Sequence, residues 1–296
     1  MQPPVNLQPA PTQRVSAIPF PERYQLPPKP DGQGSAQDAA RQTTFVLRED
    51  LRLFEEGMNL QLRLVQDASH SSFRKHPYAS IIGLWSRTFS ALADGCLLAT
   101  RASYESCAPL TRAACEYVAA QHQLHAGEMD QFLEWLGSSL KPDEQHKAID
   151  VGMGRYFAGE TLAADGRLRS VYRPASELGR PNFGATLLAV GPESNHTRLA
   201  LTFADTTFHV GWAELALGWL LALCERQLAV VVHANDVFAI HEDSHRAYTE
   251  FARRVDETLG RSDRCRTEEV EVDGRKRYLV HNFRRQPSGA PKKVLL

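Results

Sequence analysis

Hydrophobic residues between Leu47 and Ala68 recur at intervals of three, four and seven positions. This spacing matches the 3.6-residue turn of an α-helix and gathers the apolar side chains on one face. Acidic and basic residues occupy the remaining positions, so the pattern predicts an amphipathic helix with one solvated face. His76-Pro77 ends this region.

Four further helices are expected before the middle of the chain, over residues 78–101, 104–127, 130–140 and 142–160. The first is apolar on most sides, which favours a place within the core. A break near Ser103 separates it from the second, whose Pro109 lies in the first turns, where proline is tolerated. Gly127 is a stop signal for that helix.

The most apolar stretch runs from Val210 to Val232 but contains Glu214, Glu225 and Arg226. A membrane span needs about 20 residues that are nearly free of charge. We therefore expect a buried helix that begins near Phe208, and no membrane span. After a break at residues 233–235, a further helix is expected over residues 237–259.

Residues 161–209 change in character, since glycine, proline and arginine become frequent. Within them, TLLAVG and RLALTF flank PESNHT, which predicts a β-hairpin near residues 185–204. A second hairpin is expected over residues 268–283, where apolar residues alternate on both sides of Asp273-Gly274. This dipeptide is the favoured sequence of a type I′ turn.

These elements predict a mainly α fold, a bundle of about six or seven helices with two small β-hairpins. We expect three parts: a disordered proline-rich tail over residues 1–35, a helical core domain over 36–262 that includes the first hairpin, and a C-terminal hairpin with a basic tail over 263–296. The apolar helices also allow a homodimer.

Composition limits the function only broadly. The formal net charge is -1, and basic residues do not alternate with aromatic ones, so nucleic-acid binding is not indicated. The five cysteines form no C-x-x-C pair, which favours buried reduced thiols. The sequence begins MQPPVNLQPAP rather than with basic and then apolar residues, so we expect a cytoplasmic protein. No dinucleotide, phosphate-loop or serine-hydrolase motif is found.

Arg112 and Glu116 are the first candidates for a functional pair. Four residues separate them, so both lie on one face of the predicted helix, among alanines, a cysteine and a valine. Charges in so apolar a helix need partners. The pair is either a structural ion pair or a site in which the guanidinium holds an anion. If the pair is buried, Arg112→Ala should cost about 3–5 kcal/mol of stability.

A second candidate is the segment from His241 to His245, which fits H-E-x-x-H and resembles the zincin metalloprotease signature at three residues. In that motif two histidines one helical turn apart hold zinc, and the glutamate, here Glu242, activates water. Asp243 between the histidines and the lack of a third histidine ligand downstream depart from the family. The other interpretation is an exposed polar helix face.

A third candidate is Arg226 with His233, whose spacing resembles the Arg-x(4–6)-His signature of the HEPN helical ribonucleases. That resemblance implies His233 as general acid or base and Arg226 as the group that stabilises the phosphate. Arg63 with His70 and Arg275 with His281 also have this spacing, which is common by chance in a chain with 11 histidines.

YESCAPLTRAACEYVAAQHQL and ASELGRPNFGATLL together resemble bacterial, mainly helical families of unknown function. Those families have an Arg-x-x-x-Glu helix and a later Ser-Glu-x-x-His-Pro-Asn segment. Here Glu177 and Asn182 match the second motif, but Arg180 replaces its histidine. The resemblance spans roughly residues 80–235 and implies a helical core around these two segments, without a known reaction.

We therefore expect a cytoplasmic helical protein that binds a small ligand or a protein partner, with a polar centre of Arg112, Glu116, Arg180 and Asn182. Two alternatives are a metal-dependent hydrolase, which would hold zinc at His241 and His245 with Glu242 as base, and a metal-independent HEPN-like ribonuclease. The sequence does not decide whether the protein is an enzyme.

Overall fold

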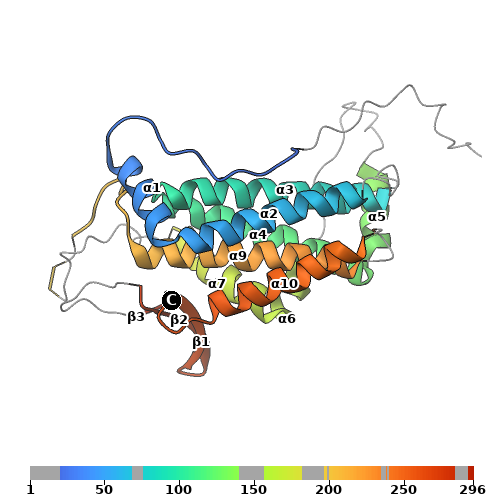
Figure 1. Ribbon diagram of the computed structural model, residues 1–296. Helices are drawn as coiled ribbons and strands as arrows, with labels where there is room; N and C mark the ends of the chain where they lie inside the picture. Colours follow the sequence, from blue (N-terminus) through green and yellow to red (C-terminus); the bar gives the residue numbers. More distant parts are fainter. Residues whose placement is uncertain are drawn as a thin grey trace, which may run out of the picture.

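A computed structural model describes residues 21–68, 76–139, 157–181, 197–198, 200–234, 238, 240–283 and 293–296 (Figure 1). This part of the chain is a mainly helical bundle with nine α-helices and a small antiparallel sheet of three strands. The predicted fold class is thus confirmed.

The α-helices are α1 (Ser35–Val46), α2 (Arg48–Ala68), α3 (His76–Thr100), α4 (Tyr104–Gln123), α5 (Met129–Ser139), α6 (Gly159–Ala164), α7 (Gly166–Gly179), α9 (Val210–His233) and α10 (Glu242–Leu259). A short kinked segment, η1 (Leu124–Glu128), joins α4 to α5. The strands are β1 (Arg266–Val272), β2 (Arg275–His281) and β3 (Lys293–Leu295).

Helix α9 forms the centre of the molecule. It packs against α2, α3, α4, α7 and α10, so other helices surround it (Figure 1). In the described part of the chain it is the one helix long and apolar enough to cross a membrane, and 94% of its most apolar stretch is buried inside the protein. The prediction of a buried core helix over residues 210–232 is confirmed.

Buried polar side chains in this core are paired with one another. The amides of Gln121 and Gln227 bond reciprocally, at 2.7 and 2.9 Å, and tie α4 to α9. The amide of Gln61 accepts the indole N–H of Trp85 at 2.9 Å. These pairs satisfy groups that would otherwise each cost about 1–3 kcal/mol when buried.

Close approach of α2 to α9 and α10 depends on Gly57. A Cβ atom added at this position would lie 2.7 Å from Sγ of Cys224 and would overlap the ring of Phe251. All five cysteines are buried and free, as the sequence predicts. Burial raises the pKa of the Cys96 and Cys224 thiols to about 12, so both are protonated near neutral pH.

Residues 21–34, the described part of the predicted tail, contain no helix. Tyr24 is nevertheless buried, and its ring makes edge-to-face contacts with Phe54 and Phe89. Its backbone N–H and C=O both bond to the side chain of Asn59, at 2.9 and 3.1 Å. The prediction of a disordered tail therefore does not extend to Tyr24, which anchors this segment to the bundle.

Helices α6 and α7 lie around and after residue 161, where the sequence becomes rich in glycine and arginine and no helix was expected between residues 160 and 208. Asp165 caps α7, which explains why a glycine-flanked, arginine-rich segment becomes helical. Pro174 lies inside α7 and lacks the N–H that would bond the carbonyl of Ser170. That carbonyl instead accepts the Thr267 hydroxyl at 3.2 Å, and this bond ties β1 to α7.

The predicted turn at Asp273-Gly274 is confirmed. Both residues have positive φ angles, 51° and 69°, as a type I′ turn requires, and they join β1 to β2. Within the basic C-terminal tail, β3 pairs with β2, and Leu296 exchanges two backbone hydrogen bonds with Tyr278. Most of the first predicted hairpin and nearly all of the helix expected over 142–160 lie outside the described residues.

Candidate functional site

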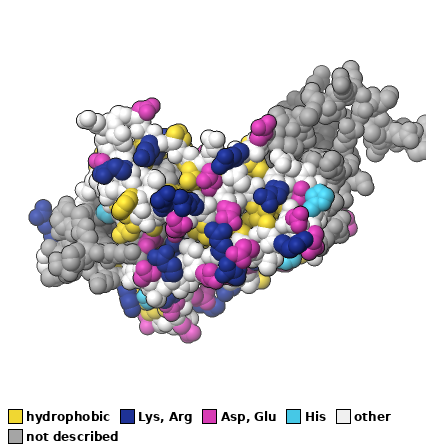
Figure 2. Space-filling view, viewed as in Figure 1, with side chains coloured by type: hydrophobic (Ala, Val, Ile, Leu, Met, Phe, Trp, Pro, Cys, Tyr) yellow, Lys and Arg dark blue, Asp and Glu magenta, His cyan; other side chains and the backbone are white. Residues whose placement is uncertain are grey.

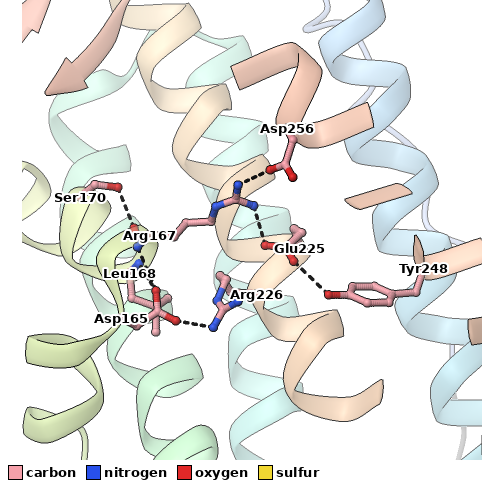
Figure 3. A network of polar contacts seen from close by, with 8 residues as sticks. All are labelled: Asp165, Arg167, Leu168, Ser170, Glu225, Arg226, Tyr248 and Asp256. Atoms are coloured by element: carbon pink, nitrogen blue, oxygen red, sulfur yellow. Dashed lines mark hydrogen bonds and ion pairs between the residues drawn. The ribbon is translucent and has the colours of Figure 1, made fainter. Parts of the chain in front are cut away.

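A polar network joins α7, α9 and α10 beside the apolar core (Figure 3). Arg167 donates to the buried Glu225 at 2.7 Å and also pairs with Asp256. The other carboxylate oxygen of Glu225 accepts the hydroxyl of Tyr248 at 3.1 Å. The charge of Glu225, which the sequence placed inside an apolar helix, is therefore balanced by an arginine from α7 and a hydroxyl from α10.

Asp165 connects this network to the start of α7. Its Oδ1 accepts the backbone N–H groups of Arg167 and Leu168, both at 2.9 Å, and its Oδ2 accepts from Arg226 (Figure 3). A carboxylate at this position also interacts favourably with the positive end of the helix dipole. One side chain thus stabilises α7 and positions Arg226 beside it.

Asp165 also lines a cavity of about 400 Å³ between η1 and α6. The described lining residues are His122, Gln123, Ala126, Gly127, Glu160, Thr161, Ala164 and Asp165. The chain bends at Gly127, whose φ of 144° suits glycine, and the bend gives one wall of the cavity.

Gln123 and Thr161 are the buried polar residues among the described lining of the cavity. Only 5% of the surface of Gln123 is exposed, yet its Oε1 has no hydrogen-bond partner in the described structure. An unpaired buried acceptor costs about 1–3 kcal/mol.

His122 reaches solvent beside Gln123 and lies 3.4 Å from the Thr161 hydroxyl through its Nδ1. Partial burial, followed by the positive charge of Arg226, lowers the pKa of His122 below its usual range. The imidazole is therefore neutral near pH 7, and one ring nitrogen is able to accept a hydrogen bond.

Of the four residues of the predicted polar centre, Arg112 and Glu116 form an ion pair. Arg112 Nη2 lies 3.2 Å from Oε1 of Glu116, and its guanidinium stacks over the ring of Tyr172 on α7. Burial lowers the pKa of Arg112, but Glu116 and Tyr172 outweigh it, and the pKa is raised overall. Arg180 lies 3.7 Å from Glu177, and both are largely exposed. Asn182 lies outside the described residues.

The H-E-x-x-H residues do not form a zinc-binding donor set. His241 precedes the first residue of α10 and its side chain is 75% exposed, while Glu242 pairs loosely with Arg246 at 3.9 Å. Over the described ranges, no three His, Cys, Asp or Glu side chains gather closely enough to hold a metal ion.

Arg226 and His233 lie two turns apart on α9, and each has another partner. Arg226 bonds to Asp165, and the ring of His233 makes an edge-to-face contact with Tyr248, with centroids 6.2 Å apart. Neither residue is among the described lining residues of the cavity.

His122, Gln123 and Asp165 were not singled out from the sequence. Asp165 could have been predicted as a helix N-cap, since aspartate is favoured at that position and apolar residues follow it at helical spacing. His122 and Gln123 carried none, because their role depends on α6, which approaches from 40 residues further along the chain.

Comparisons with known proteins find no matching family model, no matching curated protein and no matching solved structure. Function therefore has to be argued from the residues described above.

Proposed function

We propose that this chain is a cytoplasmic helical binding protein whose ligand, a small molecule rich in hydrogen-bond donors, occupies the cavity between η1 and α6. The observation that carries the proposal is the lining of that cavity, which brings the carboxylate residues Glu160 and Asp165 together with His122 and Gln123. Small-molecule sites are concave and contain a few well-placed polar groups.

The cavity wall is rich in acceptors. Besides Gln123, it contains the carboxylates of Glu160 and Asp165 and the neutral ring of His122. The nearby cation Arg226 is already bound to Asp165. This arrangement favours a ligand with an ammonium group or several N–H groups over an anion.

The surface supports a small ligand over a nucleic acid. On the face in Figure 2, Lys and Arg side chains are interspersed with Asp and Glu, and neither sign gathers into a stripe. A stripe of positive charge is the usual feature of a surface that follows a phosphate backbone. The ribonuclease and hydrolase alternatives, and a homodimer, stay predictions with less geometric support than the cavity.

Calorimetric titration with 1,4-diaminobutane tests the proposal, with uncharged 1,4-butanediol as the matched probe. We expect the diamine to bind and the diol to bind about tenfold more weakly or not at all. Gln123→Leu should weaken diamine binding about tenfold, because one buried hydrogen bond to a charged group is lost.

Gln123→Leu should leave the free energy of unfolding unchanged or higher, since the Gln123 Oε1 atom makes no hydrogen bond in the described structure. Glu49→Gln, on the exposed side of α2, is the control and should not change binding. Equal binding of diamine and diol, no binding of either, or full diamine affinity in Gln123→Leu would each overturn the proposal.

A further inference from the structure

Residues 21–30, here called the strap, run past α2 and α3 before α1 begins (Figure 1). Tyr24 is buried and Leu26 packs partly against the core, while Arg23 and Gln25 are exposed. Inward and outward side chains therefore alternate, as they do in an extended peptide that lies on a surface. The strap is seated on the bundle in the manner of a bound peptide, although it belongs to the same chain.

The ring of Tyr24 is the anchor of the strap. It makes edge-to-face contacts with Phe54 on α2 and Phe89 on α3, with ring centroids 5.9 and 6.1 Å apart. Burial, followed by the neighbouring thiol of Cys96, raises the pKa of the Tyr24 hydroxyl. Buried aromatic anchors of this kind usually dominate the binding of a peptide.

Asn59 on α2 binds the backbone of the same anchor residue. Its Oδ1 accepts the N–H of Tyr24 at 2.9 Å, and its Nδ2 donates to the Tyr24 carbonyl at 3.1 Å. Next to it, Glu55 lies 4.0 Å from the guanidinium of Arg23. The strap site, defined as Phe54, Asn59 and Phe89, thus recognises an aromatic residue through its ring and its backbone.

A hinge connects the strap to the bundle. Residues 31–34, Asp-Gly-Gln-Gly, are exposed and precede the first residue of α1. Gly32 and Gly34 have positive φ angles of 92° and 150°, and a Cβ atom added at either would meet nothing within 4 Å. The strap can therefore swing about this hinge while α1 keeps its place.

An open strap would leave Phe54 and Phe89 facing water, so the strap site needs another occupant when the strap leaves. We propose that the strap is exchangeable, and that two copies of this chain pair when the Tyr24 ring of each enters the strap site of the other. A second copy carries the identical segment, so exchange reproduces the same contacts without a new interface.

A peptide of residues 21–30, PERYQLPPKP, tests the strap site in the full chain. We expect the fluorescently labelled peptide to bind the Tyr24→Ala chain, measured by polarisation. The unchanged chain should bind it at least about tenfold more weakly, because its own tethered strap competes at an effective concentration of about millimolar. The same peptide with alanine in place of its tyrosine should also bind at least about tenfold more weakly.

Complementary variants test the exchange between copies. Asn59→Leu impairs the strap site and keeps an intact strap, whereas Tyr24→Ala impairs the strap and keeps an intact site. Analytical ultracentrifugation should find each variant monomeric alone and a heterodimer in their mixture. Arg52→Gln, an exposed change on α2, is the matched control and should pair with Tyr24→Ala at least about tenfold more weakly, because its strap stays in its own site.

Hydrogen exchange on the unchanged protein gives a test that needs no variant. The backbone N–H of Tyr24 should exchange faster than the amides of α9, because the strap opens without unfolding of the bundle. Exchange of Tyr24 as slow as that of α9, no binding of the peptide to the Tyr24→Ala chain, equal binding of both peptides, or no heterodimer would each overturn the proposal. The strap site shares no residue with the cavity beside η1, so failure here leaves the diamine proposal untouched.

Discussion

Two ion pairs in this protein differ in how they are buried. Arg112 and Glu116 lie four residues apart on α4, with side chains 36% and 26% exposed. Arg264 and Asp50 lie 214 residues apart in sequence, with side chains 2% and 4% exposed. Arg264 also donates to the carbonyl of Glu214 on α9 at 2.8 Å, so it joins three separated segments.

The spacing of Arg112 and Glu116 is visible in the sequence because helix geometry sets it. The burial that makes an ion pair costly to break comes from the elements that cover it. The Arg112–Glu116 pair, which the sequence indicated, is therefore half-solvated. The buried Arg264–Asp50 pair could not be recognised from any short sequence motif, because its residues are far apart in the chain.

The largest expected effect is from Arg264→Met. The substitution leaves the carboxylate of Asp50 buried without its partner, which should lower the free energy of unfolding by about 3–5 kcal/mol. Urea denaturation at pH 7 measures it. The control is the double variant Asp50→Leu with Arg264→Met, which removes both charges and should recover most of the loss. A loss below about 1 kcal/mol in the single variant would contradict this assignment.

Glu225→Gln should have an intermediate effect. Glu225 is 6% exposed and its partner Arg167 is 31% exposed, so this pair lies between the other two. Arg167 keeps Asp256 and some access to water, and we expect a loss of about 1–3 kcal/mol. Tyr248→Phe removes a single hydrogen bond to the same carboxylate and should cost about 1 kcal/mol. Equal losses in both variants would show that the charge of Glu225 does not matter.

The part of the fold that could be predicted is the part governed by local periodicity. The apolar stretch at Val210 and the heptad-like pattern from Leu47 each specify a helix, and Asp273-Gly274 specifies a turn. Helix α7 was missed because Pro174 and the glycines at its ends act as helix breakers in isolation. Its stability depends on the Asp165 cap and on Thr267. The Thr267 hydroxyl donates a hydrogen bond to the carbonyl of Ser170, which Pro174 leaves without its usual helical partner.

The candidate site could be predicted less well than the fold. Its side chains come from α4, α6 and the start of α7, and no spacing rule connects His122 with Asp165. A short motif such as H-E-x-x-H determines only the relative position of residues one helical turn apart. Here the motif lies at the exposed start of α10. The unpaired acceptor of Gln123 is a property of packing, so only the structure reveals it.

Arg112→Ala tests the contribution of the more exposed of the two ion pairs to stability. The sequence predicted a loss of about 3–5 kcal/mol, which requires a buried pair. Because both side chains are partly solvated, we now expect a loss of about 1 kcal/mol or less, including the lost contact with Tyr172. Urea denaturation of Arg112→Ala and Arg264→Met under the same conditions compares the two losses of unfolding free energy. Equal losses would show that the two pairs do not differ in their contribution to stability.

The smallest expected effect is a pH dependence from His122. Its pKa is lowered in the folded protein by partial burial and by Arg226, with further contributions from His125 and His233, while Asp165 opposes the shift. The unfolded chain therefore binds more protons than the folded one near and below the usual histidine pKa of about 6.5. The stability that neutral His122 provides is present above that pH and is lost as the pH falls through it.

His122→Asn should reduce the loss of unfolding free energy between pH 7.5 and 5.5, measured by urea denaturation, relative to the unchanged protein. His241→Asn is the matched control, because this histidine is 75% exposed and lies outside the cavity wall. If both variants show the same pH dependence of the unfolding free energy as the unchanged protein, the pKa of His122 does not differ between the folded and unfolded chain. The cavity would then have no imidazole that is held neutral. If only His122→Asn flattens the dependence, the imidazole is held neutral beside Gln123, as a site for a hydrogen-bond donor requires.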